Sequence, residues 1–281
     1  MSDSRFRLAV CQIRTRMDKS ETLRRAEEMI REASLGGASV VVLPEMFTSP
    51  CSHEYFHEYS EPLNGETVQA LSRWASEYNV ILIGGSIPET EDGRLYNSSY
   101  VFDRDGSTLS RHRKVHMFDI DLKDQFTFNE SDSFSPGEDY CVFDTELGRF
   151  GVAICFDIRF PEFIRGLARR GAELILLPAQ FTMPTGEKHW DLMTRARAVD
   201  NEVWFVGAEA ARDPDGPFQC WGHSTIVSPY GEIIAQADET EQILYGDIDL
   251  SEVDRVRSQL PTFLKLRDDF YPVNDGYPII S

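Results

Sequence analysis

Three residues of different chemistry follow apolar, strand-like stretches at three separate places in the chain: Glu45, Lys114 and Cys155. Reactive groups collect beyond the carboxyl ends of strands in α/β sheets, so we expect these side chains to meet at one end of a sheet. A carboxylate can take the proton of a thiol, and the thiolate can attack a carbonyl carbon to form a thioester. An ammonium can stabilise the oxyanion. The three residue types together indicate a cysteine hydrolase.

Each of the three also has a purely structural interpretation. A free cysteine is most often a small buried hydrophobe, and a glutamate after a strand is most often on the surface. Lys114 lies in the basic run Arg111–His116, and such a run is more often a solvated face. The chain has only five lysines among its 28 basic residues, however, so a lysine next to apolar strands is a candidate functional cation.

A competing pattern stands at His53-Glu54-Tyr55-Phe56-His57, which matches the HExxH sequence of zinc peptidases. On a helix this spacing puts both histidines on one face, and Glu77 is a candidate third ligand. Pro50 and Pro62 leave room for only a short helix. The alternative is a polar loop with aromatic side chains near the entrance to the site.

The elements that must position these residues alternate between strands and helices. Strands are predicted at Phe6–Ile13, Val40–Leu43, Val80–Ser86, Leu95–Asp103, Thr108–Arg113, Phe150–Cys155, Glu173–Leu177, Val203–Glu209, His223–Val227, Ile233–Ala237 and Ile243–Ile248. Helices are predicted at Asp18–Leu35, Glu66–Tyr78, Pro161–Arg170, Glu187–Asn201 and Ser251–Gln259. Val115–Glu138 is predicted to be a long polar loop that forms an active-site wall. The order indicates one α/β domain over residues 1–281, with layered sheets and outer helices.

Composition excludes several classes of protein. The 281 residues carry a formal net charge of −19, which argues against nucleic acid or an anionic membrane as partner. The five cysteines are odd in number and form no CxxC pair, which favours free thiols in a reducing cytoplasm. The first residues do not read as a signal peptide, and the apolar runs are too short to span a membrane. We therefore expect a soluble cytoplasmic protein.

Three segments resemble the signature segments of the carbon–nitrogen hydrolase (nitrilase) superfamily. They are Leu43-Pro-Glu-Met-Phe47, His112-Arg-Lys-Val-His116 and Ala153-Ile-Cys-Phe-Asp-Ile-Arg-Phe160. The resemblance as a whole extends from Arg7 to Tyr271. It implies Glu45 as general base, Lys114 as oxyanion stabiliser and Cys155 as nucleophile. It adds Glu130, which orients Lys114 and the substrate amide, and the backbone N–H of Phe156 in the oxyanion hole.

The same resemblance implies a four-layer αββα sandwich that needs no metal or organic cofactor. Such chains usually form homodimers with an eight-layer stack, and we expect the C-terminal tail, about residues 261–281, at the dimer interface. The expected partners are a small amide substrate and a second copy of the chain, or more copies in a higher oligomer.

Within the superfamily the chain is most similar to the omega-amidases, which hydrolyse 2-oxoglutaramate and 2-oxosuccinamate. The likeness lies in Leu82–Glu89, Leu95–Asn97, Met117–Asp121 and Trp221–Ser224. It implies that Arg159 binds the substrate carboxylate, which suits the planar guanidinium; the alternative is a structural salt bridge. Phe181 and Thr185 match the substrate-contacting residues of that branch.

Two departures leave the substrate open. Cys51 stands where omega-amidases have a pocket tyrosine, and the loss of a phenol hydroxyl changes the hydrogen bonding of the distal pocket. Thr182-Met-Pro184 resembles the deaminated-glutathione amidases, which are the nearest alternative. An alternative of a different class is a non-catalytic scaffold on a retained hydrolase fold.

Overall fold

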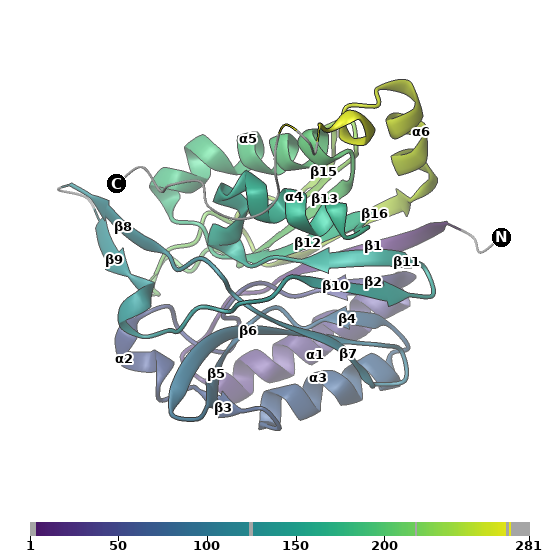
Figure 1. The fold of residues 1–281 in the computed structure, drawn as a ribbon. Coiled ribbons are helices and arrows are strands. Elements are labelled where there is room, and N and C mark those ends of the chain that lie inside the picture. Colours follow the sequence, from purple (N-terminus) through teal and green to yellow (C-terminus); the bar gives the residue numbers. More distant parts are fainter. Residues whose placement is uncertain (1–3, 124–125, 217, 268–269, 271–281) are drawn as a thin grey trace.

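Two β-sheets lie face to face, and helices cover the outer side of each (Figure 1). The structure is a computed structural model that describes residues 4–123, 126–216, 218–267 and 270. The predicted four-layer αββα arrangement is confirmed.

The first sheet is formed mainly by the N-terminal half of the chain. Its order is β16 (Gln242–Asp249), β1 (Arg5–Gln12), β2 (Ala38–Val42), β4 (Ile81–Ile83), β6 (Arg94–Phe102), β5 (Ile87–Glu91) and β3 (Glu61–Pro62), and β7 (Thr108–Arg113) also pairs with β6. Successive side chains of a strand point to opposite faces. In β1, Leu8 and Val10 therefore enter the core between the sheets, whereas Ala9 and Cys11 face the outer helices.

The second sheet follows the same pattern in the C-terminal half. Its order is β10 (Cys141–Thr145), β11 (Gly148–Val152), β12 (Leu174–Ala179), β13 (Trp204–Glu209), β14 (Thr225–Val227) and β15 (Ile233–Gln236). In β12, Leu174 and Leu176 join the core between the sheets, and Ile175 and Leu177 pack against helices. Because both faces of β12 and β13 are buried, these two strands read as continuous apolar runs in the sequence.

The helices form the two outer layers. The first sheet is covered by α1 (Lys19–Leu35) and α3 (Glu66–Glu77), and the second by α4 (Pro161–Arg169) and α5 (Met183–Asn201). Asp18 caps α1, since its side chain accepts hydrogen bonds from the N–H groups of Ser20 and Glu21. The shorter helices are α2 (His53–Phe56), α6 (Ser251–Gln259), η1 (Glu130–Asp132), η2 (Cys155–Arg159) and η3 (Phe263–Lys265).

The structure corrects several of the sequence-based elements. Val115–Glu138 is not one long loop, because it contains η1 and a hairpin of β8 (Asp119–Leu122) and β9 (Phe126–Asn129). Cys155 does not end a strand: β11 stops at Val152, and Cys155 is the first residue of η2. The strands β3, β5 and β10 and the helix α2 were not predicted. The sequence predicts the C-terminal tail, about residues 261–281, at the dimer interface. Within that tail, residues 268–269 and 271–281 lie outside the described part of the chain.

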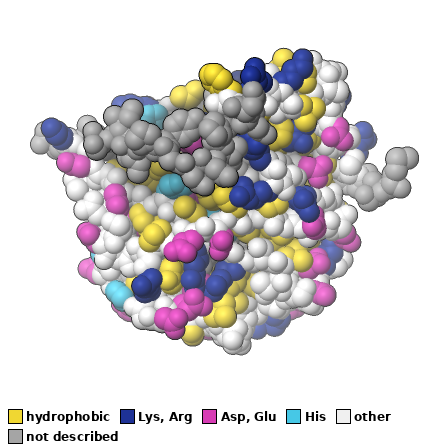
Figure 2. Space-filling model, in the orientation of Figure 1, with side chains coloured by type: hydrophobic (Ala, Val, Ile, Leu, Met, Phe, Trp, Pro, Cys, Tyr) yellow, Lys and Arg dark blue, Asp and Glu magenta, His cyan; other side chains and the backbone are white. Residues whose placement is uncertain are grey.

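Acidic and basic side chains are interspersed on the face over β6 and β7 (Figure 2). There Arg111 and Arg113 each form ion pairs with Glu89 and Glu91. The basic run Arg111–His116 is therefore not a uniformly solvated face. Lys114, in the middle of it, is only 2% exposed. None of the described helices combines the length and the apolar character that a membrane span requires.

Candidate active site

The turn that carries Cys155 has a constrained backbone. Cys155 has φ of 41°, in the left-handed region that non-glycine residues seldom adopt. The buried carboxylate of Asp157 stabilises this turn by accepting a hydrogen bond from the N–H of Ile154 at 2.9 Å. Backbone strain of this kind persists only where surrounding contacts determine it. The thiol is thus presented by a tight turn after β11 rather than by the strand itself.

Glu45, Lys114 and Glu130 converge in one buried cluster. The Nζ atom of Lys114 donates to Glu45 Oε1 at 2.8 Å and to Glu130 Oε2 at 2.7 Å. The side-chain nitrogen of Asn97 donates to both carboxylates, at 2.8 Å to Glu45 and 3.1 Å to Glu130. The backbone N–H of Phe118 donates to Glu130 at 2.7 Å. Two carboxylates are thereby held around one ammonium, which fixes its position.

Burial dominates the electrostatics of this cluster. Removal from water raises the pKa of Glu45, and the nearby Glu130 charge raises it further against the opposing effect of Lys114. Burial by itself would lower the Lys114 pKa, but Glu130 and Glu45 raise it well above its ordinary value. Lys114 is therefore a permanent cation at neutral pH, while Glu45 is a carboxylate whose basicity is increased.

Cys155 lies beside Glu45 at the bottom of the site. Its thiol donates a hydrogen bond to the backbone oxygen of Gln180 at 3.8 Å and lies within reach of the Glu45 charge. Burial, followed by the Glu45 charge, raises the pKa of the Cys155 thiol well above its ordinary value. The resting sulfur is thus a thiol with a basic carboxylate next to it. Within the described residues, the N–H of Phe156 has no acceptor and is available to an oxyanion.

The predicted carboxylate-binding residue, Arg159, lies next to this cluster at the end of η2. Its guanidinium stands over the rings of Phe156 and Phe181, at 5.5 and 5.2 Å from their centres. Its polar contacts are His189 Nδ1 at 3.3 Å and a methionine sulfur. Burial lowers the pKa of Arg159, and in the described part of the chain no carboxylate pairs with it. The salt-bridge alternative is therefore not what the structure shows.

Phe181 and Thr185 have different surroundings. Phe181 is buried against Trp190, and its N–H donates to Glu209 at 2.9 Å. The Thr185 hydroxyl is buried on the first turns of α5 and hydrogen-bonded to the Thr182 hydroxyl at 2.8 Å. Phe181 contacts the Arg159 guanidinium, and none of Arg159, Phe181 and Thr185 lines the cavity around Cys155.

The catalytic cluster lines a small, partly open cavity of about 20 Å³. This volume holds roughly one water molecule. Cys51, the residue that departs from the omega-amidase pattern, lines the cavity. The full lining is Glu45, Met46, Cys51, Phe56, Lys114, Phe118, Phe128, Glu130, Cys155, Gln180 and Phe218.

Comparison with known proteins agrees with this geometry. Residues 7–258 match the family described as "Carbon-nitrogen hydrolase". The chain belongs to the carbon–nitrogen hydrolase family. It is 47% identical to "Omega-amidase NIT2" of Bos taurus over 268 residues, which cover 95% of this chain and 97% of that relative.

Two solved structures share the fold of this carbon–nitrogen hydrolase. Nit3 of Saccharomyces cerevisiae, a member of branch 10 of the nitrilase superfamily, is 37% identical with a TM-score of 0.84 and covers 92% of this chain and 94% of its own. The NitFhit protein of C. elegans is 30% identical with a TM-score of 0.88 and covers 97% of this chain and 68% of its own. The resemblance inferred from the sequence is confirmed.

The HExxH segment of this carbon–nitrogen hydrolase does not assemble a zinc site. The helix α2 has only four residues, so His57 lies beyond its end. His53 instead bonds Ser133 through Nδ1 at 2.7 Å and stacks on Phe128. Within residues 4–123, 126–216, 218–267 and 270, no three His, Cys, Asp or Glu side chains are placed to hold a metal ion.

Three polar residues near the site were not assigned a role from the sequence. Asn97 bridges the two carboxylates, Gln180 bonds the backbone oxygen of Glu45 at 2.8 Å, and Glu209 holds the N–H of Phe181. Gln180 follows the buried strand β12, and Glu209 is the last residue of the buried strand β13. The rule that groups at carboxyl ends of strands form the site could have found both, had it been applied to every strand of the chain.

Proposed function

We propose that this chain is an omega-amidase, which hydrolyses the primary amide of 2-oxoglutaramate or 2-oxosuccinamate to the 2-oxo dicarboxylate and ammonia. The observation that carries the proposal is the buried set of Glu45, Lys114 and Cys155 beside an arginine that has no carboxylate partner among the described residues. The first three supply a base, a fixed cation and a nucleophile. Arg159 supplies a charge for the substrate carboxylate. The high identity to omega-amidases supports this substrate class.

The first half of the reaction forms a thioester. As the sulfur of Cys155 bonds to the amide carbon, Glu45 takes the thiol proton and the carbonyl oxygen becomes an oxyanion. Lys114 Nζ and the N–H of Phe156 stabilise that charge. Glu45 then gives the proton to the amide nitrogen, the C–N bond breaks, and ammonia leaves.

The second half of the reaction hydrolyses the thioester. The same carboxylate takes a proton from water, and the hydroxyl attacks the thioester carbon. When the C–S bond breaks, the thiolate recovers its proton from Glu45, and the acid is released. Glu130 takes no part in these proton transfers: its carboxylate holds Lys114 Nζ and is itself held by the backbone N–H of Phe118.

Ammonia release from a panel of amides tests this function. We expect 2-oxoglutaramate to be the fastest substrate and Cys155→Ala to lose activity. Cys11→Ala is the matched control, since Cys11 is also buried but packs on the outer face of β1, away from the catalytic cluster. Faster turnover of deaminated glutathione than of 2-oxoglutaramate would instead assign the chain to the deaminated-glutathione amidases. Full activity of Cys155→Ala, or no activity on any amide, would overturn the thiol mechanism.

We also propose that the chain is a homodimer that joins through the face of α5 and β15. Leu192 and Val199 on α5 are 66% and 44% exposed, Ile233 and Ile234 of β15 are 37% and 46% exposed, and α5 and β15 are both in the half of the molecule that holds the second sheet (Figure 1). Large exposed apolar side chains gathered on one face are typical of interfaces. Light scattering should give twice the chain mass, and Leu192→Glu should reduce it to one copy.

Residues 1–281 are proposed to form a single catalytic domain in a reducing compartment such as the cytoplasm. The single domain is supported by β16, a C-terminal strand that completes the N-terminal sheet beside β1. The compartment is supported by five cysteines that are all free. One cooperative unfolding transition and five alkylatable thiols in the unfolded chain are the expected results.

A further inference from the structure

One peptide group joins the nucleophile to a buried carboxylate that the mechanism does not use. The backbone oxygen of Gln180 accepts the hydrogen bond from the Cys155 thiol at 3.8 Å. The N–H of the same peptide group, which belongs to Phe181, donates to Glu209 Oε1 at 2.9 Å and to Oε2 at 3.1 Å. A peptide group is planar and trans, so its C=O and N–H point in opposite directions. A bond that holds the N–H therefore also sets the direction of the oxygen that faces the thiol.

Glu209 has a fixed place in the fold. It is the last residue of β13, where it pairs with Ala179 of β12, and it is fully buried. Its backbone N–H donates to the hydroxyl of Ser224 at 3.0 Å, and that hydroxyl donates to Gln12 Oε1 of β1 at 2.8 Å. The residue is thus tied to both sheets. Its carboxylate is presented to Phe181 from an anchored strand end.

The carboxylate of Glu209 is unfavourable for the stability of the fold. Burial raises the pKa of Glu209 well above its ordinary value; the bond from the Phe181 N–H opposes this shift, and the Glu45 charge adds to it. Among the residues that the structure describes, no lysine or arginine forms an ion pair with Glu209. A buried carboxylate without a cation is costly. Groups of this kind are found more often at functional sites than in ordinary packing.

Phe181 also connects Glu209 to the arginine that is expected to bind the substrate carboxylate. The centre of the Phe181 ring lies 5.2 Å from the Arg159 guanidinium and 5.0 Å from the ring of Trp190. The ring and the N–H that Glu209 holds belong to the same residue. A shift of this backbone would therefore displace the ring beside Arg159 as well as the carbonyl beside the thiol.

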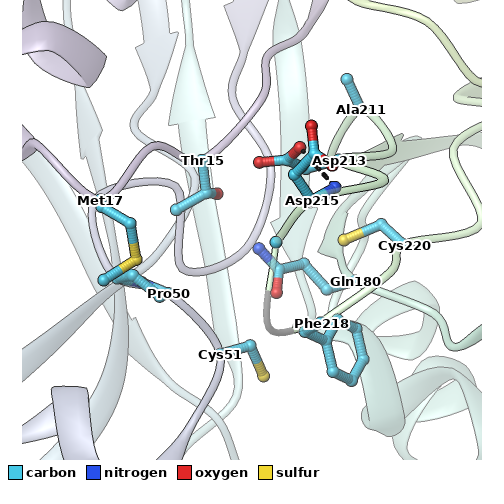
Figure 3. Close-up of a pocket in the computed structure, with 11 residues that line it drawn as sticks. Thr15, Met17, Pro50, Cys51, Gln180, Ala211, Asp213, Asp215, Phe218 and Cys220 are labelled. Atoms are coloured by element: carbon cyan, nitrogen blue, oxygen red, sulfur yellow. Dashed lines mark hydrogen bonds between the residues drawn. The ribbon is translucent and has the colours of Figure 1, made fainter.

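The peptide group lies in the wall between two cavities. Gln180 lines both the small cavity around Cys155 and an adjoining pocket of about 250 Å³, in which Figure 3 shows its side chain. Its Nε2 donates to the backbone oxygen of Glu45 at 2.8 Å, so the segment of the base contacts the same residue. Glu209 lines neither cavity. It can act on the reacting groups only through the peptide group between Gln180 and Phe181.

We propose that Glu209 is a positioning residue for the reaction, which aims the Gln180 carbonyl at the thiol and keeps the Phe181 ring against Arg159. The inference rests on the proposed function, because it takes Cys155 as the nucleophile and Arg159 as the carboxylate-binding residue. What Glu209 supplies is a hydrogen-bond acceptor at the correct reach. Without that acceptor the peptide plane can rotate, and the thiol loses the partner that directs it.

Three substitutions separate the reach of this side chain from its charge. Glu209→Gln keeps an acceptor at the same reach without the charge, Glu209→Asp keeps the charge on a shorter side chain, and Glu209→Leu fills the space with neither. We expect kcat for 2-oxoglutaramate to stay within about threefold of wild type in Glu209→Gln and to fall roughly 100-fold in the other two. Those two should also raise KM for 2-oxoglutaramate but not for propionamide, which has no carboxylate for Arg159.

Stability and a second buried glutamate provide the controls. Loss of a costly buried charge should leave the melting temperature of Glu209→Gln at or above that of wild type. Glu202→Asp should keep kcat, since Glu202 is also buried and bonds the backbone N–H groups of Thr262 and Phe263, at 3.0 and 3.2 Å, outside the catalytic cluster. A wild-type kcat for Glu209→Asp, or equal losses in Glu209→Asp and Glu209→Gln, would overturn the proposal even if Glu209→Leu fails to fold.

Alkylation of Cys155 by iodoacetamide gives a readout that needs no amide substrate. The charges that act on this thiol are those of Glu45, Lys114, Glu209 and Arg159. The Glu209 charge raises the thiol pKa, so its removal in Glu209→Gln lowers that pKa and should make alkylation at least as fast as in wild type. Glu209→Asp keeps the charge but releases the peptide group, and its alkylation should be about tenfold slower.

The two readouts distinguish a failure of the positioning role from a failure of the proposed function. If no amide is cleaved but alkylation follows this order, the amidase function fails and the positioning of the thiol by Glu209 stands. If 2-oxoglutaramate is cleaved equally well by wild type and Glu209→Asp, the amidase function stands and the role of Glu209 is excluded.

Discussion

The carboxylate of Asp157 accepts hydrogen bonds from both the backbone N–H and the ring Nδ1 of His116, at 3.0 and 2.8 Å. His116 lies two residues after Lys114. The other oxygen of Asp157 accepts the N–H of Ile154, immediately before Cys155. One buried carboxylate therefore ties the segment that carries the cation to the turn that carries the nucleophile. Burial opposes its ionisation, but the bonds from His112 and His116 hold the pKa of Asp157 below its ordinary value.

Asp157→Asn should lower kcat while KM changes little. An asparagine keeps one acceptor but turns an amide nitrogen towards donors that need an acceptor, so the Cys155 turn shifts relative to Lys114. A displacement near 1 Å can reduce the rate roughly 100-fold. The alkylation rate of Cys155 by iodoacetamide should fall as well. Asp144→Asn is the control, because Asp144 is an exposed acid that pairs with Arg149. A kcat for Asp157→Asn within twofold of wild type would contradict the link.

Glu130→Gln should move the acidic limb of the kcat/KM profile to lower pH. In the wild type, burial and the Glu130 charge hold the pKa of Glu45 above its ordinary value of 4.5. Activity that requires ionised Glu45 is lost as pH falls through this raised pKa. Removal of the Glu130 charge lowers the Glu45 pKa, so more of the base survives in acid. The shift is measured from kcat/KM profiles of both proteins over about pH 4 to about pH 8. An acidic limb that stays in place or moves to higher pH would exclude the Glu130 charge as a cause of the raised Glu45 pKa.

Arg159→Met should raise KM for carboxylate-bearing amides. A charged hydrogen bond contributes about 1.5 to 3 kcal/mol, which corresponds to a roughly 10- to 100-fold change. A neutral amide such as propionamide should be affected much less, because it has no carboxylate to lose. Arg149→Met is the matched control, since Arg149 is an exposed arginine on β11. An equal loss on both kinds of substrate would mean that Arg159 only supports the fold.

Phe150→Ala should lower the free energy of unfolding by about 3 to 5 kcal/mol. Phe150 is fully buried between the two sheets, with its ring centre 5.8 Å from that of Phe6 on the opposite sheet. The small side chain leaves a cavity that neighbouring strands cannot fill. Leu35→Ala, at a residue that is 82% exposed, should change stability by less than about 0.5 kcal/mol. Urea titrations of the two variants provide the comparison.

Much of the fold could be predicted because its central strands are buried on both faces. Continuous apolar runs are compatible with little else than buried strands, as at Val40–Leu43 and Glu173–Leu177. The helix that begins near Asp18 has a clear N-terminal cap. The hairpin of β8 and β9 was missed, since its short strands mix charged and apolar residues in a segment that reads as a loop. Its pairing depends on the partner strand rather than on the local pattern.

The candidate site was predictable in its members but not in its geometry. Residue types at strand ends indicated Glu45, Lys114 and Cys155, and the resemblance added Glu130. The turn at Cys155 could not be read from its sequence, because the apolar run through Ala153 and Ile154 continues after the strand has ended. The turn is held by the Asp157 carboxylate, which accepts bonds from the nearby N–H of Ile154 and from His116, far away in the sequence.

The pairing of β1 with β16 has a consequence for biosynthesis. Among the described residues, the first strand in the sequence lies beside the last, from Arg5 opposite Asp249 to Gln12 opposite Gln242. Until β16 is made, one edge of β1 therefore exposes a row of unpaired backbone groups to other nascent chains. A product that stops before β16 keeps this open edge permanently. Premature termination should thus yield aggregating fragments rather than a partly active enzyme.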